Sequence, residues 1–448
     1  MRRHHCVGGH ADRPRIRREQ RCSRYAHAAA ATASAARQQL TCAALADTIV
    51  LTAGITVSSQ LLVNRNLTVR GDPAQCATAN SGPAPTAGLC TLSGGGASRI
   101  FKVYNAGAAV TLTLSSLALV FGSDVADSLG GAAVLLLPGT STAASPALVA
   151  TGCVFQGNSA TGTGPGGAVS ANPSTLPAAS MAMTLTNTAF LQNSALSAAG
   201  AVLAAGPTVL ANVSFVGNSA TYAAAQLTNV TTQVSGSLGL GFAGALQLAS
   251  CAGVTGSSLS ITGGSFAGNW GTQGGAVVCG PDCTCTLGGG VSFANNSAVG
   301  ASLVGGACTA GSGGAVVSLP GSTLQITGAS FSNNTASCDG GAVFLSGNKQ
   351  GSIANTLGGI YGFVRASPVL TFTAGTSAAL TALPVTGRFS SVTLAGNTAL
   401  LNGGGLYLGA PRSRQPPRRD ADSARHRRGR GRRDERQRLH LHRRRLAH

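Results

Sequence analysis

Residues 265–277 read SFAGNWGTQGGAV, and two short words inside this stretch return along much of the chain. The first word is Phe-x-x-Asn, here Phe266–Asn269, and the second is Gly-Gly-Ala-Val, here Gly274–Val277. Copies of each word follow one another at about 25 to 40 residues, a period that is typical of stacked repeat units. Such a chain builds an elongated solenoid and not one globular core.

The copies of both words can be read directly from the sequence. The first word stands at Phe155 with Asn158, Phe190 with Asn193, Phe215 with Asn218, Phe266 with Asn269, Phe293 with Asn296, and Phe331 with Asn334. The second word opens with Gly166 and Gly167, Gly274 and Gly275, Gly313 and Gly314, and Gly340 and Gly341, with weaker forms at 130–132, 200–202, 244–246 and 403–406. Because the words recur in nearly every unit, we interpret these residues as structural repeat positions; a catalytic site would need only one copy.

The residues upstream of each Phe indicate strands. In four units apolar or small residues stand seven and five positions before the Phe, as Leu148 and Ala150 do before Phe155. A spacing of two places both side chains on one face of a strand. The Gly pair permits positive φ and needs no side-chain room, so it can turn the chain sharply before the next strand. Each unit therefore predicts strand, turn, strand, turn, with almost no helix.

A single unit of this kind cannot bury its apolar face, so it must stack on its neighbours, with parallel strands about 4.8 Å apart. The sequence predicts an all-β fold, a right-handed parallel β-helix. In that fold the Phe side chains stack inside the coil. The Asn side chains form a ladder at a bend, where we expect Asn to adopt a left-handed backbone and its amide to bond along the stack.

The chain divides by composition into four parts. Residues 1–40 hold nine Arg against two acidic residues, and residues 410–448 hold fifteen Arg against four. We predict a basic targeting segment or disorder over 1–40, N-terminal coils of the β-helix over 41–129, the repeat region over 130–409, and a disordered tail or misassigned reading frame over 410–448. The Arg-rich tail has no interleaved aromatic residue on which bases could stack, and this disfavours nucleic-acid binding.

The paired words resemble the repeats of the polymorphic outer membrane proteins of chlamydiae, whose signature is Gly-Gly-Ala-(Ile/Val/Leu) together with Phe-x-x-Asn. The resemblance covers about residues 130–408. It implies a surface-exposed β-helix that acts in adhesion, and similar repeats occur in large eukaryotic secreted or cell-wall proteins.

Cysteine usage indicates an oxidising compartment. Cys76 and Cys90 flank a Pro- and Gly-rich loop, which predicts a disulfide between them. Cys279, Cys283 and Cys285 with Cys308 allow either disulfides or a four-thiolate zinc site, and we favour disulfides because the spacing lacks a two-residue knuckle and no His is near. No window reaches eighteen uninterrupted apolar residues, so no membrane span is predicted. We expect an extracellular or cell-surface protein, in the wall or at the outer membrane.

Residues suited to acid–base catalysis are scarce. The chain has no His between His27 and His426 and no Glu between Glu19 and Glu435, which excludes a Ser-His-Asp arrangement within the repeats. Within the repeats the one close carboxylate pair is Asp124 and Asp127, in a turn where polar residues are expected anyway.

We therefore predict no catalytic, cofactor or metal site. The expected function is that of a non-enzymatic adhesion, cell-wall or matrix scaffold whose partners are carbohydrate or cell-surface components. The alternative is a polysaccharide-active β-helix enzyme of the pectate lyase kind.

Overall fold

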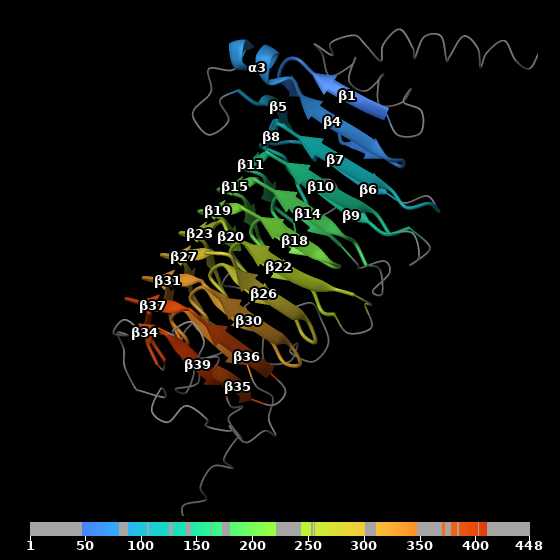
Figure 1. Ribbon diagram of the computed structural model, residues 1–448. Helices are drawn as coiled ribbons and strands as arrows, with labels where there is room; N and C mark the ends of the chain where they lie inside the picture. Colours follow the sequence, from blue (N-terminus) through green and yellow to red (C-terminus); the bar gives the residue numbers. More distant parts are fainter. Residues whose placement is uncertain are drawn as a thin grey trace, which may run out of the picture.

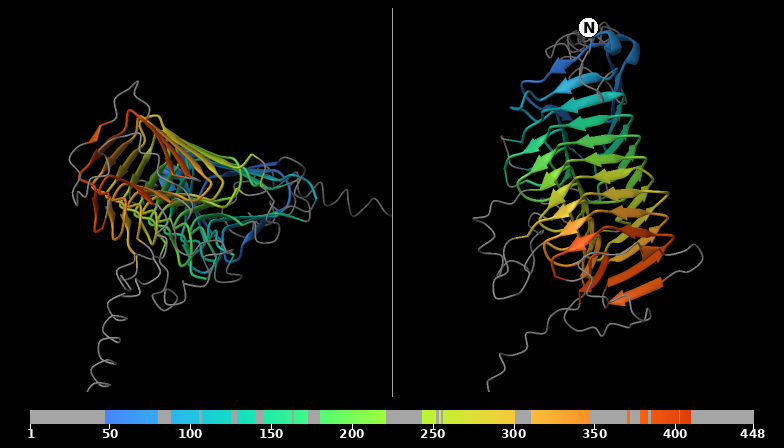
Figure 2. Two further views of the ribbon diagram at one scale, coloured as in Figure 1. Left: turned by 90° about the horizontal axis from the view of Figure 1, so that it is seen from below. Right: turned by 90° about the vertical axis from the view of Figure 1, so that its left-hand side faces the viewer.

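The computed structural model describes residues 47–79, 88–104, 107–124, 129–139, 145–162, 164–172, 180–220, 243–251, 254, 256–300, 311–346, 370–371, 378–382, 385–401 and 403–409. Their strands wind into one stack of parallel coils (Figures 1 and 2). The predicted fold class, an all-β parallel β-helix, is confirmed. The basic segments 1–40 and 410–448 lie outside the described residues.

Four sheets form the walls of the solenoid. Sheet A has the order β1 (Asp47–Leu51), β4 (Leu67–Gly71), β7 (Thr111–Ser115), β10 (Ala147–Thr151), β14 (Met183–Thr186), β18 (Thr208–Ala211), β22 (Ser258–Thr262), β26 (Thr284–Gly288), β30 (Thr323–Thr327), β36 (Val385–Ser390) and β35 (Ala378–Ala382). Sheet B has the order β2 (Ile55–Thr56), β5 (Cys90–Ser93), β8 (Leu117–Val120), β11 (Val154–Gln156), β15 (Ala189–Leu191), β19 (Ser214–Val216), β23 (Ser265–Ala267), β27 (Ser292–Ala294), β31 (Ser330–Ser332), β37 (Thr393–Ala395) and β34 (Leu370–Thr371).

The other two sheets complete each coil. Sheet D has the order β12 (Ser159–Ala160), β16 (Ser194–Ala195), β20 (Ser219–Ala220), β24 (Trp270–Gly271), β28 (Ser297–Ala298), β32 (Thr335–Ala336) and β38 (Thr398–Ala399). Sheet C has the order β3 (Leu61–Val63), β6 (Phe101–Tyr104), β9 (Val134–Leu137), β13 (Val169–Ala171), β17 (Val202–Ala204), β21 (Leu246–Leu248), β25 (Val277–Cys279), β29 (Val316–Ser318), β33 (Val343–Ser346) and β39 (Leu406–Gly409).

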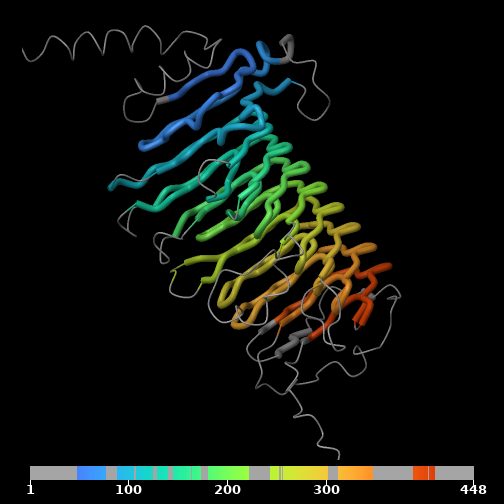
Figure 3. The backbone as a smooth tube through the Cα atoms, turned by 180° about the vertical axis from the view of Figure 1, so that it is seen from behind, coloured from blue at the N-terminus to red at the C-terminus, as the bar shows by residue number. Residues whose placement is uncertain are grey.

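The chain passes through the sheets in the order A, B, D, C and then enters the next coil. For example, β10, β11, β12 and β13 make one coil, and each pairs in parallel with its equivalent in the next, β14, β15, β16 and β17. Figure 3, seen from behind, shows the successive coils lying one on another. Among the described strands, only β34 and β35 pair antiparallel, against β37 and β36. Equivalent residues of successive coils therefore stack in columns.

The Phe of the first word forms the central column of the core. Phe155, Phe190, Phe215, Phe266, Phe293 and Phe331 are fully buried, with neighbouring ring centroids 4.7 to 4.8 Å apart and ring planes within 12° of parallel. Leu119 precedes this column and Leu394 follows it at the same register. Six stacked rings thus link consecutive coils through apolar burial and aromatic contact.

The Asn of the first word forms a second column, a ladder of buried amides. It comprises Asn158, Asn193, Asn218, Asn269, Asn296, Asn334 and Asn397. Nδ2 of Asn193 donates to Oδ1 of Asn218 at 3.0 Å and to the carbonyl of Phe155 at 2.9 Å. Oδ1 of Asn193 accepts from Nδ2 and from the backbone N–H of Asn158, at 2.9 and 3.0 Å. Each interior rung therefore satisfies its whole side-chain amide within the stack.

The expectation that these Asn residues have a left-handed backbone is wrong. The positive φ lies one residue earlier, as at Gln192 (53°), Gly268 (61°) and Asn295 (54°). That position is exposed in these coils, so the chain turns there without crowding the core. The following Asn is then free to direct its amide along the stack.

The two Gly residues of the second word serve different purposes. The first has a left-handed backbone, with φ of 62° at Gly274 and 70° at Gly313. The second lies against the next coil, where a Cβ on Gly275 would overlap the carbonyl oxygen of Gly314, and one on Gly314 would overlap that of Gly341. The first Gly is required by conformation and the second by close backbone approach.

Insertions lengthen individual coils without disturbing the columns. Consecutive ladder Asn residues are separated by 25 residues between Asn193 and Asn218, by 51 between Asn218 and Asn269, and by 63 between Asn334 and Asn397. The Asn–Asn hydrogen bonds nevertheless stay between 2.8 and 3.0 Å. The register of the stack is thus independent of the length of the connecting segments.

One described helix, α3 (Pro73–Ala79), was not predicted. The backbone N–H of Ala74 donates to the Asp72 carboxylate at 3.1 Å, and Pro73 occupies the first helical position. Asp followed by Pro is a helix-start signal, so the start of this helix was indicated by the sequence. The pattern was too short to be distinguished from a turn.

We expect Phe266→Ala to lower the free energy of unfolding by about 3–5 kcal/mol, because it opens a cavity inside the ring column. Phe266→Leu should cost less, since Leu occupies this register in the coils at either end. Chemical denaturation measures both, with Phe121→Ala as the exposed control (54% exposed). Equal stability of Phe266→Ala and wild type would contradict the assigned column.

We expect Asn269→Ala to lower the free energy of unfolding by about 3 kcal/mol or more. It removes the acceptor of the Asn218 backbone N–H and Nδ2 and the donor to the Phe215 carbonyl, all of them buried. Asn64→Ala, at an exposed position, should change stability by less than about 0.5 kcal/mol. Similar effects of the two substitutions in the same denaturation assay would argue against the ladder as a source of stability.

Candidate functional surface

The outer face of sheet A is a broad, regular surface. Figure 1 shows the strands of this sheet lying side by side along the stack. They alternate between buried and more exposed residues, and the register aligns the outward residues in columns. The middle column runs Thr68, Thr113, Val149, Thr184, Val209, Ser260, Thr286, Gln325 and Arg388. A neighbouring column runs Arg70, Ser115, Thr151, Thr186, Ala211, Thr262 and Gly288.

This face is uncharged over most of its length. From β7 to β30 no strand of sheet A contains Asp, Glu, Lys or Arg. The charged residues of its strands are Asp47 in β1, Arg70 in β4 and Arg388 in β36, near the two ends of the sheet. Its hydroxyl groups both donate and accept hydrogen bonds, and its methyl groups offer apolar contact. The face is therefore suited to a neutral, hydroxyl-rich surface and not to a polyanion.

Asp124, one member of the carboxylate pair considered for glycoside hydrolysis and interpreted as a turn residue, is 1% exposed. Its Oδ1 accepts from the backbone N–H groups of Thr161 and Gly162 at 2.7 and 3.3 Å, and its Oδ2 accepts from that of Gly130 at 3.1 Å. This carboxylate is occupied in holding the turn of one coil to the next. Its sequence neighbour Asp127 lies outside the described residues.

Arg99 lies on the other side of the same turn and is 3% exposed. Its guanidinium donates to the carbonyls of Gly130 and Gly131 at 3.0 and 3.1 Å and to Oε1 of Gln60 at 3.0 Å. Asp124 and Arg99 thus bind opposite ends of the Gly130–Gly131 segment. The sequence did not single out Arg99, and an isolated Arg before a strand carries no signal of burial.

The remaining described carboxylates are dispersed along the stack. Asp47 begins β1, Asp72 precedes α3, Asp282 lies before β26, and Asp339 lies before β33. Within the described part of the chain, no three His, Cys, Asp or Glu side chains gather as metal ligands would.

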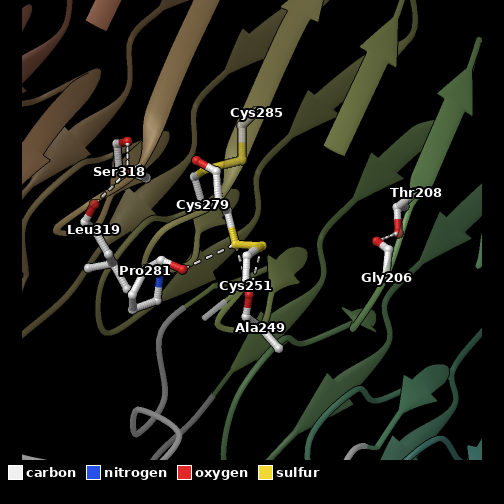
Figure 4. The surroundings of a disulfide bond; sticks show 11 residues. Gly206, Thr208, Ala249, Cys251, Cys279, Pro281, Cys285, Ser318 and Leu319 are labelled. Atoms are coloured by element: carbon white, nitrogen blue, oxygen red, sulfur yellow. Dashed lines mark hydrogen bonds between the residues drawn. A yellow bond between two sulfur atoms is a disulfide. The ribbon is translucent and has the colours of Figure 1, made fainter. Parts of the chain in front are cut away.

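Most cysteines of the described part of the chain form disulfides. Cys76 is bonded to Cys90, Cys251 to Cys283, and Cys279 to Cys285. Figure 4 shows Cys279, at the end of β25, beside Cys285 on β26, with Cys251 close by. Because Cys279, Cys283 and Cys285 are bonded in disulfides, they cannot act as thiolate ligands of a zinc ion. The predicted disulfide between Cys76 and Cys90 is confirmed. The pairings of Cys251 with Cys283 and of Cys279 with Cys285 could not be read from the sequence, since they depend on which coils become neighbours.

Cys338 is also disulfide-bonded, and Cys308 lies outside the described residues. Cys153 is the one free cysteine of the described part of the chain. Burial raises the pKa of the Cys153 thiol to about 11, so the group is neutral at physiological pH. It is a core residue of the stack and has no nucleophilic character.

The described residues include no helix with the length and apolar character needed to cross a bilayer. No protein family, curated protein or solved structure matches this chain.

The raised pKa of Cys153 makes stability depend on pH. The thiol keeps its proton more tightly in the folded state, so its contribution is complete below pH 9 and is lost as the pH rises toward about 11. We expect the stability advantage of wild type over Cys153→Ala to shrink by about 2 kcal/mol between pH 8 and 10.5. Denaturation across this range measures it, and parallel pH profiles for the two proteins would contradict burial of the thiol.

Proposed function

We propose that this protein is a non-enzymatic β-helix, secreted or displayed at the cell surface, that acts as an adhesion, cell-wall or matrix scaffold. The uncharged outer face of sheet A is the contact surface, and uncharged polysaccharide or an equivalent cell-surface component is the partner. The observation that carries this proposal is the column of Thr, Ser and Val residues that runs without charge from β7 to β26.

The way in which the repeats use their polar groups supports a scaffold. The ladder amides bond only within the stack, and the carboxylate of Asp124 accepts hydrogen bonds from three backbone N–H groups. The recurring polar positions thus hold the rod together, which leaves the outward side chains for contact with a partner. Repeat proteins of this kind commonly bind through such extended surfaces.

Disulfides between coils support an oxidising, extracellular setting, since they persist outside the cytosol. The likeness of the two repeat words to those of the polymorphic outer membrane proteins supports adhesion. The alternative, a pectate-lyase-like enzyme, requires carboxylates available to substrate or calcium, and the inward use of Asp124 speaks against it.

Pelleting with insoluble cellulose, β-glucan or chitin tests the proposal. We expect the full chain to sediment with at least one of them, equally at low and high ionic strength, because the contact face is neutral. Thr184→Glu combined with Thr286→Glu should weaken binding about tenfold, since each carboxylate must lose its water on contact. Ser330→Glu, on the outer face of sheet B, is the matched control and should bind like wild type.

Two results would contradict the proposal. One is equal binding by the sheet A double variant and the control. The other is turnover of polygalacturonate, with or without calcium, that is abolished by Asp124→Asn, because it would establish the enzymatic alternative.

A further inference from the structure

One residue interrupts a regular column on the outside of sheet D. The outward position of this sheet is Ser159, Ser194, Ser219, Ser297, Thr335 and Thr398 in six coils. Hydroxyls of adjacent rungs bond to each other, Ser159 with Ser194 at 2.9 Å and Thr335 with Ser297 at 3.1 Å. In the coil of β24 the same position is Trp270, paired with Ser219 on one side and Ser297 on the other.

The fold does not account for this Trp. Trp270 is 39% exposed and lies outside the core clusters, although the indole is large and apolar. Its backbone N–H donates to the carbonyl of Asn218 at 3.0 Å, a bond that Ser219 makes equivalently to Asn193. The six remaining coils of sheet D form the same backbone arrangement with Ser or Thr at this position, so the fold does not require Trp there. A departure confined to one coil is the pattern expected of a binding site and not of a structural repeat.

The surroundings of Trp270 are polar, neutral and accessible. Asn295 and Val299 stand two residues on either side of its partner Ser297, and both are exposed, Val299 to 50%. Both residues flank β28 on the adjacent coil, where the backbone N–H of Val299 donates to the carbonyl of Gly271 at 2.8 Å and that of Gly268 donates to the carbonyl of Ala294 at 3.0 Å. The exposed indole thus has Ser219 and Ser297 as its partners along the stack, and Asn295 and Val299 stand on the adjacent coil to either side of Ser297.

We propose that Trp270 is a saccharide-binding platform, and that its ligand is a neutral polysaccharide of β-linked hexopyranose units. The C–H groups on the flat side of such a sugar ring pack on the electron-rich indole face. The hydroxyls of Ser219 and Ser297 and the amide of Asn295 supply hydrogen bonds to the sugar hydroxyls. The inference rests on the proposed function and deepens it, because it adds a defined sugar subsite on a face other than that of sheet A.

Trp270 is the only Trp of the chain, so tryptophan fluorescence reports on this position alone. We expect titration of the full chain with cellohexaose, laminarihexaose or mannohexaose to give a saturable change in emission with at least one of them. Calorimetry with that sugar should give the same affinity. Binding detected by calorimetry without any change in emission would place the site elsewhere and overturn the proposal.

Trp270→Ser restores the residue found in the neighbouring coils, so we expect an unchanged thermal midpoint and an affinity for the oligosaccharide reduced about tenfold or more. Trp270→Phe keeps an aromatic ring and should retain part of the affinity. Phe121→Ser removes an exposed aromatic residue from another coil and should bind like wild type.

The two proposals fail in different ways. If Trp270→Ser binds the oligosaccharide as wild type does, the Trp270 site is wrong, while pelleting with insoluble polysaccharide through sheet A would still support the scaffold function. If the full chain neither pellets with any polysaccharide nor responds to any oligosaccharide, both proposals are wrong.

Discussion

The buried amide ladder is the constraint on which the rest of this molecule depends. An Asn side chain carries two donor hydrogens and one acceptor oxygen, and burial makes any unpaired atom among them costly. Asn269 meets this demand only when the coils above and below place their own Asn and Phe carbonyl at the same register. A slip by one residue would leave these groups unpaired, so the ladder determines how each coil lies on the next.

The other columns follow from that register. The Phe rings stack because they stand three residues before the ladder Asn in each coil, and the second Gly of the other word can approach its neighbour only when the coils are aligned. Weaker copies show what is tolerated. Ala199 takes the left-handed position of the first Gly with φ of 57°, but the close-approach position that follows remains Gly200. Steric overlap with backbone is a stricter limit than an unfavourable φ.

The same register organises the surface. Outward side chains of successive coils fall into columns, so the Thr and Ser residues of sheet A become an extended neutral face although they are far apart in the chain. Against such regularity, a single change such as Trp270 in the Ser and Thr column of sheet D stands out as local specialisation. The few buried charges have a different role, because Arg99 and Asp124 hold the turn where the ladder begins. At this turn Gly122 stands where the following coils have a ladder Asn, and its backbone N–H donates to Oδ1 of Asn158.

The sequence by itself determined the architecture, because the recurring words impose the same chemistry on every coil. From Phe266–Asn269 and Gly274–Val277 alone, the strands, the aromatic column and the amide ladder were predictable. Other contacts form only because coils of unequal length become neighbours, and these contacts were decided by the tertiary structure. It pairs Cys251 with Cys283, draws Arg99 and Asp124 to one turn, and aligns the outward residues of sheet A. These contacts join residues whose separation in the chain follows no period, so no local sequence pattern predicts them.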